Sequence, residues 1–421
     1  MQVEFKEKNM KTKAVRLYGK NDLRLEEFEL APLKDDEIRI KVIADSVCMS
    51  TYKTAMQGAD HMRVPNNVAE NPTIIGHEFC AEIVEVGKKW QGDYAVGEKV
   101  IMPPVLEYLG GVDTIGYSFQ DIGGVSTYST VYSHIIENGY LIKLQSDAFF
   151  NGSLIEPASC VLRGYKANFH LDADQNHIMG IKEGGNIAIL AGCGPMGLVA
   201  IDCALHGDIK PSLVVVTDLD ETRLSRAKSI FTPEDAMKDG IKLVFTTATD
   251  KDSLLTISEG KGFDDVFVYA PVAPVVELAD KILAFDGCLN FFAGPTDKAF
   301  SANFNFYNVH YARHHVVGTS GSTVEDMRDI VRLIGEKRIK PSVMITHIGG
   351  IDAAIDTTLR LPKIAGGKKL IYTHINMPLT AIADFETLGK QDARFATLAK
   401  IIKNNGGLWN ATAELYLLQN W

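Results

Sequence analysis

A glycine-rich segment carries the most specific chemical pattern in this 421-residue chain. Gly192-Cys193-Gly194-Pro195-Met196-Gly197 fits G-x-G-x-x-G, follows an apolar run at 186–190 and opens a helix-like run at 195–205. The first glycine of such a loop permits a tight turn, the second lets the backbone approach a pyrophosphate, and the third lets helix and strand pack closely. Free N–H groups at the helix start then bind phosphate. We therefore predict a dinucleotide site rather than a structural turn, formed by Gly192, Gly194, Pro195, Met196 and Gly197.

Two charged residues after the loop bear on the choice of dinucleotide. Asp218 follows Gly197 by 21 residues, at the end of the next predicted strand. A carboxylate at that place accepts hydrogen bonds from ribose hydroxyls and repels a 2′-phosphate, which favours NAD over NADP. Arg223 lies five residues further on and could reach a 2′-phosphate, so NADP stays open.

A second set of residues has the chemistry of a metal site. Cys48, His77 and Glu78 offer sulfur, nitrogen and oxygen ligands that suit Zn²⁺, and a catalytic zinc keeps one position open. Glu156 lies in an apolar context and is a candidate fourth ligand, or a partner of a zinc-bound water. The simpler interpretation of Cys48 is a buried small hydrophobe. Because 29 residues separate Cys48 from His77, spacing alone does not decide between them.

The elements that position these residues change character along the chain. The first part predicts an antiparallel barrel or sandwich, with β-branched strands at 12–19, 22–30, 37–47, 79–87, 98–104, 128–136 and 141–144. After Glu156, short apolar strands alternate with helices, which predicts a parallel sheet covered on both faces. Its expected strands are 186–190, 213–218, 243–247, 264–270, 287–294 and 315–319. A helix is expected at 322–337, capped by Ser322 or Thr323.

Composition and charge exclude several classes of protein. Hydrophobic residues make up 46% and charged residues 23% of the chain, as in ordinary globular proteins. The net charge of -10 argues against a nucleic-acid partner or an anionic membrane, but a small anionic substrate needs only a local cationic pocket. Six cysteines without a C-x-x-C pair, and no apolar signal core in residues 1–10, favour the cytoplasm. The apolar stretch 187–205 contains Asp202 and predicts a buried strand and helix rather than a membrane span.

The order of the motifs resembles the zinc-dependent medium-chain dehydrogenases over about residues 13–373. The motifs that carry the resemblance, besides the dinucleotide loop, are Cys48-Met49-Ser50-Thr51, Gly76-His77-Glu78, Val96-Gly97-Glu98-Lys99-Val100 and Glu156-Pro157. The glutamate of the last motif, together with residues 214–223, is similar to the sorbitol dehydrogenase branch. A narrower similarity is to the L-sorbose 1-phosphate reductase subgroup, in 290–295, 306–311, 346–350 and 366–372.

The resemblance implies a fold and roles for single residues. The α/β fold would be a GroES-like β-barrel catalytic domain at 1–162, a Rossmann domain at 163–317, and a return to the catalytic domain with a helical C-terminal extension at 318–421. Zinc would be held by Cys48, His77 and Glu78 or Glu156. Ser50, two positions after the zinc cysteine, would relay the alcohol proton.

Two departures from the family pattern refine these expectations. Residues 102–122 contain no cysteine, so we expect one catalytic zinc and no structural zinc. Five residues after the zinc cysteine, where many members have a histidine, stands Lys53, which could meet a substrate phosphate or lie solvated. His61, Arg63 and Arg163 are further cationic candidates for such a phosphate, each of which could equally lie solvated.

The predicted reaction is hydride transfer between NAD(P)H and a ketose or ketose phosphate, interconverting a secondary alcohol and a ketone. The partner is a small sugar or sugar phosphate, and the assembly is expected to be a homodimer or homotetramer. One alternative is a polyol or threonine-type zinc dehydrogenase acting on an unphosphorylated substrate. Another is a nucleotide-binding scaffold without turnover, against which the set of four metal-type residues argues.

Overall fold

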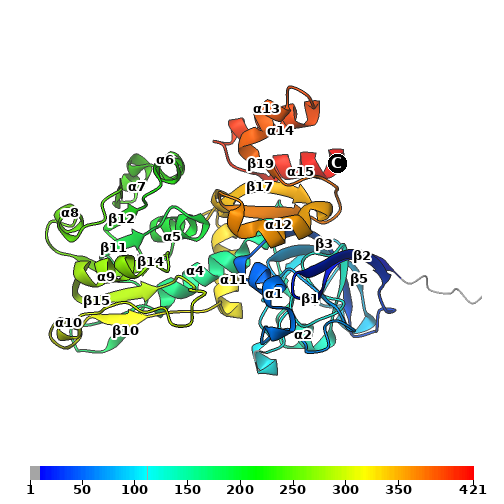
Figure 1. The fold of residues 1–421 in the computed structure, drawn as a ribbon, viewed down its shortest axis with the longest axis horizontal. Coiled ribbons are helices and arrows are strands. Elements are labelled where there is room, and N and C mark those ends of the chain that lie inside the picture. Colours follow the sequence, from blue (N-terminus) through cyan, green and yellow to red (C-terminus); the bar gives the residue numbers. More distant parts are fainter. Residues whose placement is uncertain (1–9, 111) are drawn as a thin grey trace, which may run out of the picture. The chain divides into compact units, whose positions relative to one another are not determined.

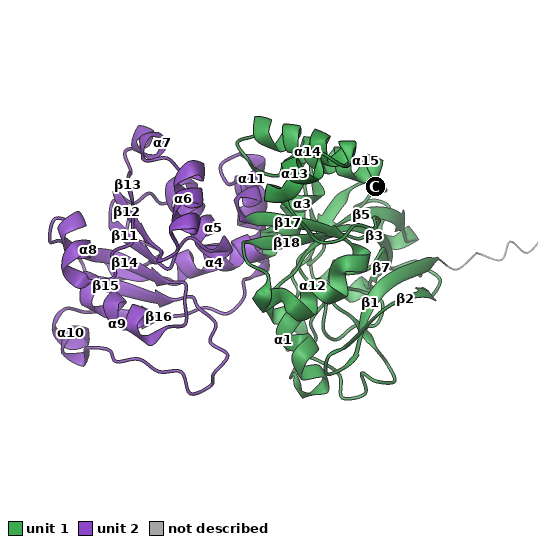
Figure 2. Ribbon diagram, turned by 45° about the horizontal axis from the view of Figure 1, so that its top comes forward, with its two compact units in different colours: residues 1–156, 345–421 green, residues 157–344 purple. Residues whose placement is uncertain are grey.

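The chain divides into two compact units in a computed structural model that describes residues 10–110 and 112–421 (Figure 1). Unit 1 holds the chain up to Glu156 together with Ile345–Trp421, and unit 2 holds Pro157–Met344 (Figure 2). Unit 2 is therefore inserted into unit 1 along the sequence. No described helix is long and apolar enough to cross a membrane.

Unit 1 is built on two sheets, antiparallel except between β17 and β18. The smaller has the order β2-β1-β4, with β1 Lys11–Gly19, β2 Asp22–Glu29 and β4 Thr73–Ile74. The larger has the order β19-β17-β18-β3-β5-β6-β8, with β7 also paired to β3. Its strands are β3 Ile38–Ser46, β5 Phe79–Val86, β6 Lys99–Ile101, β7 Tyr128–Val131, β8 Ile142–Lys143, β17 Ile345–Gly350, β18 Lys368–Tyr372 and β19 Thr380–Ala381.

Short helices connect and cover these sheets. They are α1 Met49–Gln57, α2 Ser133–Glu137, α3 Phe149–Ser153, α12 Ala354–Arg360, α13 Phe385–Leu388, α14 Ala393–Asn404 and α15 Ala411–Asn420. Single 3₁₀ turns add Gly58–Asp60, Lys88–Trp90, Glu107–Leu109, Ile351–Ala353, Leu361–Lys363 and Ile382–Asp384. Helix α4, Ile155–Ala167, begins in unit 1 and continues into unit 2.

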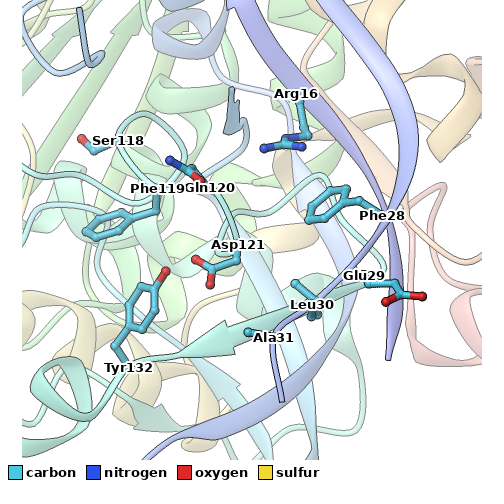
Figure 3. Close-up of a pocket in the computed structure, with 10 residues that line it drawn as sticks. All are labelled: Arg16, Phe28, Glu29, Leu30, Ala31, Ser118, Phe119, Gln120, Asp121 and Tyr132. Carbon is cyan, nitrogen blue, oxygen red and sulfur yellow. The ribbon is translucent and has the colours of Figure 1, made fainter. Parts of the chain in front are cut away.

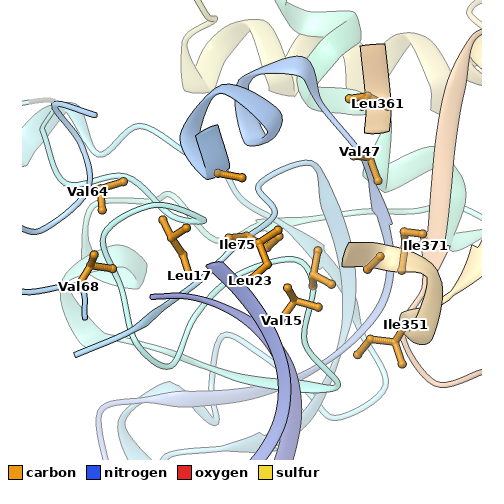
Figure 4. Packing of buried hydrophobic residues seen from close by; sticks show 13 residues of the cluster. Val15, Leu17, Leu23, Val47, Val64, Val68, Ile75, Ile351, Leu361 and Ile371 are labelled. Carbon is orange, nitrogen blue, oxygen red and sulfur yellow. The ribbon is translucent and has the colours of Figure 1, made fainter. Parts of the chain in front are cut away.

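A hydrophobic cluster of unit 1 fixes the segments from which the candidate metal ligands project (Figure 4). Val47 precedes Cys48, and Ile75 lies two residues before His77; both are buried in the cluster. Ile371 of β18 and Val64 belong to the same cluster. Burial of these apolar neighbours holds the polar residues beside them in place, because close-packed cores tolerate little displacement.

Unit 2 is built on a six-stranded parallel sheet in the order β13-β12-β11-β14-β15-β16. Every residue of β12 and β14 is buried, as expected of central parallel strands covered on both faces. The strands are β11 Asn186–Leu190, β12 Leu213–Thr217, β13 Lys242–Thr246, β14 Phe263–Val268, β15 Leu283–Phe291 and β16 His315–Val317, and a separate antiparallel pair is β9 Phe169–Leu171 with β10 His177–Met179. The helices are α5 Pro195–His206, α6 Glu221–Ile230, α7 Pro233–Lys238, α8 Lys251–Ile257, α9 Ala273–Ile282, α10 Phe306–Tyr311 and α11 Val324–Gly335, followed by the 3₁₀ turn Pro341–Met344.

The division of the chain differs from the expected boundary at 317–318, because residues 318–344 lie in unit 2. Helix α11 is held there by ion pairs: Lys166 bonds both Asp326 (2.7 Å) and Asp329 (2.6 Å). Lys340 N–H donates to the buried Asp202 of α5 at 2.7 Å. These polar contacts, together with the buried apolar face of α11 that includes Met327, Ile330 and Leu333, hold this segment in the parallel-sheet unit.

One local element also differs from expectation. The strand expected at 128–136 ends at Val131, and α2 begins at Ser133. Its β-branched residues suggested a strand, yet only four residues pair with β3.

The expected helix start at 322–323 is confirmed. Thr323 caps α11, and Asp326, the third helical residue, reaches back to complete a capping box.

Candidate metal centre and dinucleotide loop

Cys48, His77 and Glu78 come together in unit 1, with their ligand atoms all within 4.8 Å of one another. Cys48 is the extended residue that begins α1, directly after the strand β3 and Val47. His77 and Glu78 lie between the short strand β4 and the strand β5, directly before Phe79. Two strand ends that the core holds next to each other therefore bring together residues 29 positions apart.

Ser50 lies between the first two of these residues. Its hydroxyl donates to Cys48 Sγ at 2.9 Å and lies 3.2 Å from His77 Nε2. On the other side of the ring, Thr51 Oγ1 is 3.4 Å from His77 Nδ1. The sulfur and the imidazole nitrogen thus face a common point within hydrogen-bond reach, and the imidazole is oriented through both nitrogens.

Burial sets the protonation of both ligands. Burial lowers the pKa of His77 to about 4, so its imidazole is neutral at pH 7 and keeps a lone pair for a metal. Burial, followed by the charge of Glu78, raises the pKa of Cys48 to about 12. A bound divalent cation would displace that proton, since thiolate is the ligand form. The sulfur, nitrogen and oxygen donor set fits Zn²⁺.

Glu78 is held by a buried lysine that the sequence did not single out. Lys368 Nζ of β18 donates to Glu78 Oε1 at 2.7 Å and Oε2 at 2.5 Å, and both side chains are buried. Ser46 donates a further hydrogen bond to Glu78 Oε2. Both carboxylate oxygens are therefore already engaged, and any ligation by Glu78 competes with Lys368.

Glu156 is the second residue of α4 and lies outside the group of three. Its charge nevertheless contributes to raising the pKa of Cys48 and of Tyr117, after burial and other charges. It is therefore close enough to act on the centre electrostatically. Whether it ligates the metal stays a prediction.

A row of rings beside the metal ligands was also missed by sequence reasoning. Tyr117 lies 5.3 Å from the ring of His77 and 5.3 Å from the ring of His61. The guanidinium of Arg63 lies 5.9 Å from the Tyr117 ring centre. Gly116, next to Tyr117, is the sequence signal that could have drawn attention to this loop. An added Cβ at Gly116 would come within 2.3 Å of the Gly76 carbonyl oxygen, so the loop passes directly against the segment that carries His77 and Glu78.

The predicted dinucleotide loop lies in unit 2, between β11 and α5. Gly197 packs against the Gly192 carbonyl, where an added Cβ would be only 2.1 Å away, so helix and loop need glycine there. Gly194 begins α5, its backbone angles are ordinary, and an added Cβ would meet nothing within 4 Å. Pro195 fills the first helical position, and no side chain caps the helix start. Free N–H groups therefore remain for a phosphate.

The two charged candidates near this loop are placed differently. Asp218 Oδ2 accepts from Cys193 N–H at 3.0 Å, so the carboxylate lies against the loop. Arg223 pairs with Asp220 at 3.4 Å. The two substrate candidates are separated as well, because Lys53 lies half-buried on α1 of unit 1 and Arg163 lies exposed on α4 of unit 2.

Family models match both parts of the chain. Residues 34–138 match the alcohol dehydrogenase GroES-like domain, and residues 195–336 match the zinc-binding dehydrogenase model. The chain belongs to the zinc-binding dehydrogenase family. The expected GroES-like and Rossmann-like fold of this zinc-binding dehydrogenase is thereby confirmed, and it is an oxidoreductase.

Relatives of this zinc-binding dehydrogenase match it over almost its full length. The L-sorbose 1-phosphate reductase of Klebsiella pneumoniae is 47% identical, and the mannitol-1-phosphate 5-dehydrogenase of Aliivibrio fischeri is 45% identical; each match covers 97% of both chains. Among solved structures, the 2R,3R-butanediol dehydrogenase of Bacillus subtilis has a TM-score of 0.70 at 22% identity, covering 86% of this chain and 100% of that one. The fold is thus shared with a dehydrogenase whose sequence identity to this chain is only 22%.

Proposed function

We propose that this dehydrogenase interconverts a secondary alcohol and a ketone on an open-chain polyol phosphate or ketose phosphate. The observation that carries the proposal is that two relatives matching 97% of the chain, at 47% and 45% identity, are both named for phosphate esters of six-carbon sugars or polyols. Matches to sorbitol dehydrogenases are 26% identical and cover about half of the chain. We therefore favour the phosphorylated substrate over the unphosphorylated polyol.

Two groups supply the chemistry when bound: Zn²⁺ polarises the substrate oxygen as a Lewis acid, and the nicotinamide exchanges the hydride. In this proposal Cys48 and His77 hold the metal, and Glu78 or Glu156 completes the site. Thr51 orients the imidazole through Nδ1. Lys368 donates to both carboxylate oxygens of Glu78 and so holds this side chain in one orientation next to the metal.

Ser50 is the proposed carrier of the substrate proton. Its hydroxyl is within hydrogen-bond reach of both the Cys48 sulfur and the His77 nitrogen, so an oxygen of the substrate held at that point would lie next to it. A hydroxyl can accept one proton while donating another. Tyr117, whose ring lies 5.3 Å from that of His77, stays a protonated phenol because burial raises its pKa, so it is not itself the acceptor of that proton.

The parallel-sheet unit would hold the cofactor. The start of α5 binds the pyrophosphate, and Asp218 accepts from the ribose hydroxyls, which favours NAD. Arg223 is engaged with Asp220, which weakens its claim to a 2′-phosphate. A single zinc is proposed, as is a homo-oligomeric assembly.

The test is cofactor turnover by the purified, zinc-loaded protein. Absorbance of NADH and of NADPH is followed with L-sorbose 1-phosphate and with plain L-sorbose, and NAD⁺ reduction is followed with mannitol 1-phosphate and plain mannitol. We expect a kcat/KM at least about tenfold higher for the esters, corresponding to about 1.4 kcal/mol of selective binding. Equal values for ester and plain sugar would move the substrate to the polyol class.

A single variant tests whether turnover depends on the proposed zinc site. Cys48→Ala removes the only sulfur among the candidate ligands in the described residues, so bound zinc and turnover should be lost together. Metal analysis and the cofactor assay are run on the same preparation. Zinc and activity retained in this variant would overturn the metal assignment.

A further inference from the structure

We propose that Arg63, assisted by His61, binds the phosphate group of the substrate. This inference rests on the proposed function, because it assigns the recognition of the phosphate that distinguishes the proposed substrates from plain polyols. It places the phosphate subsite in unit 1, next to Tyr117. It also replaces Lys53 and Arg163 as the leading candidates.

One aromatic ring separates Arg63 from the metal ligands. The guanidinium lies 5.9 Å from the centre of the Tyr117 ring, and that ring lies 5.3 Å from the ring of His77. A guanidinium over an aromatic ring keeps N–H donors for an anion, and their planar arrangement matches a phosphate. A substrate whose oxygen lies beside Ser50 would need to extend only past Tyr117 to bring a phosphate to Arg63.

The loop that carries Arg63 is fixed through its backbone. Ser118 Oγ donates to the Arg63 carbonyl at 2.7 Å and itself accepts from Thr114 N–H at 3.0 Å. Val64, the next residue, is buried in the hydrophobic cluster of unit 1. The same short segment, 114–118, therefore holds both the cation and the ring beneath it. Such preorganisation lowers the entropic cost of binding a ligand.

The charge of Arg63 is not compensated by an acid. Among residues 10–110 and 112–421, no Asp or Glu forms an ion pair with its guanidinium, whereas Glu78 is already neutralised by Lys368. In a protein of net charge -10, an anionic substrate needs such a local cation.

His61 supplies a second donor. Its ring stacks on Tyr117 at 5.3 Å and 30°, and its Nδ1 accepts from the Arg63 backbone N–H at 3.2 Å. Burial, followed by the charge of Arg63, lowers the pKa of His61, so the ring is neutral. A neutral ring that accepts at Nδ1 carries its proton on Nε2 and donates from there.

Another arginine-containing cavity in the same unit does not suit a phosphate. This cavity of about 400 Å³ is lined by Arg16, Glu29 and Asp121 among others (Figure 3). Arg16 already pairs with Glu26 at 3.0 Å and donates to the Pro72 carbonyl at 2.7 Å. The carboxylates of Glu29 and Asp121 would repel a dianion, and the charge of Arg16 is already paired with Glu26.

The experiment compares Arg63→Gln with Arg63→Lys, using Arg360→Gln as the matched control. Arg360 is an exposed arginine of the same unit, paired with Asp356 at 3.2 Å. Each zinc-loaded variant is assayed with L-sorbose 1-phosphate and L-sorbose, and mannitol 1-phosphate is titrated calorimetrically in the presence of cofactor. Zinc content and thermal unfolding are measured on every preparation, so that misfolding is seen directly.

We expect Arg63→Gln to lower kcat/KM for the ester, and affinity for mannitol 1-phosphate, by about 10- to 100-fold, the usual worth of a charge-assisted hydrogen bond. The value for plain L-sorbose should stay within about threefold, Arg63→Lys should retain part of the preference, and Arg360→Gln should equal the wild type. An unchanged preference in Arg63→Gln, or its loss in Lys53→Gln instead, overturns the proposal. Absence of any ester preference in the wild type would instead overturn the proposed function.

Discussion

Lys368 and Glu78 form a buried ion pair beside the candidate metal ligands, 290 residues apart in the chain. Burial opposes the charge on Lys368, but Glu78 raises its pKa above the ordinary value, so the pair is ionised. Ser46 satisfies a further lone pair of the carboxylate. Such a pair adds little net stability but becomes costly when one member is removed, because the other is left buried and unpaired.

This argument predicts the outcome of a double-mutant cycle. Lys368→Met should lower the free energy of unfolding of the zinc-loaded protein by about 3–5 kcal/mol, because Glu78 is then buried without its partner. Adding Glu78→Gln removes that stranded charge, so the double variant should be more stable than Lys368→Met alone. Urea unfolding of the four proteins measures the coupling. Additive effects of the two substitutions would show that the pair is not an energetic unit.

The candidate ligands could be picked out in the sequence, but their surroundings could not. Cys48 and His77 stood out because their types and order resemble a family pattern. Lys368 lies in a stretch that carries the narrower family similarity, 366–372, but nothing in that stretch indicates a contact with Glu78. Only the pairing of β18 with β3 brings the two side chains together. Arg63 could be weighed as a cation, yet its place over Tyr117 depends on a contact between two loops.

At the scale of elements, the C-terminal helices are tied to the site-bearing sheet by one buried carboxylate. Glu414 of α15 accepts from the N–H groups of Phe149 and Phe150 at 2.6 and 2.8 Å, at the start of α3. It also accepts from Tyr372 of β18 at 2.9 Å, and Tyr372 in turn accepts from Trp409. The extension therefore caps the helix that precedes Glu156 and packs on the strand that carries Lys368.

Glu414 should make stability depend on pH. Burial raises its pKa from 4.5 to about 7, against three hydrogen bonds that lower it. The folded state then holds the proton more tightly than the unfolded state, so its contribution to stability is present below pH 4.5 and is lost as the pH rises to about 7. The free energy of unfolding, relative to a Glu414→Gln variant, should fall over this window by at most about 1.4 kcal/mol per pH unit.

The measurement is urea unfolding at several pH values from 4.5 to 7.5. Glu386→Gln is the matched control, since Glu386 lies on the same extension but is 73% exposed and only loosely paired with Lys403. Its pH profile should parallel that of the wild type. A wild-type minus Glu414→Gln difference that does not change with pH would show that Glu414 is ionised in both states.

Hydrophobic periodicity predicted the long, regular helices and strands. It failed where tertiary contacts determine whether a short segment becomes a helix or a strand. The apolar run of β12, the helix α5 and the helix α11 were all expected from the sequence. The strand expected through residue 136 gave way to α2, because Ile135 and Ile136 can be buried from a helix as well as from a strand. Short β-branched runs do not distinguish the two.

At the scale of the whole molecule, the two candidate sites lie in different units. The metal-type residues Cys48, His77 and Glu78 are all in unit 1, and the loop 192–197 is in unit 2. The sequence indicated this division, because the pattern of closely spaced β-strands before Glu156 gives way to alternating strands and helices after it. It could not assign residues 318–344, because the ion pairs of Lys166 with Asp326 and Asp329 carry no local signature.

Separate units predict that the two binding activities can be removed one at a time. Chelation of zinc should abolish turnover and leave NADH binding in place, since no candidate metal ligand belongs to unit 2. Gly194→Val should do the reverse, weakening NADH at least about tenfold while zinc stays bound. We expect the protein to accept a side chain at this position, because an added Cβ meets nothing within 4 Å and φ is -75°, so the approaching pyrophosphate is the group that would be obstructed. Gly197→Val would be ambiguous, since its Cβ would strike the Gly192 carbonyl.

NADH fluorescence titration and metal analysis on the same samples measure both effects. The informative comparison is between Gly194→Val and the chelated wild type, because each lacks turnover for a different reason. Undiminished NADH affinity in Gly194→Val would mean that the pyrophosphate does not approach the start of α5, and the dinucleotide site would have to lie elsewhere in the sheet. Loss of NADH binding on chelation would mean that the cofactor depends on unit 1, and the two units could then not be treated as independent binding modules.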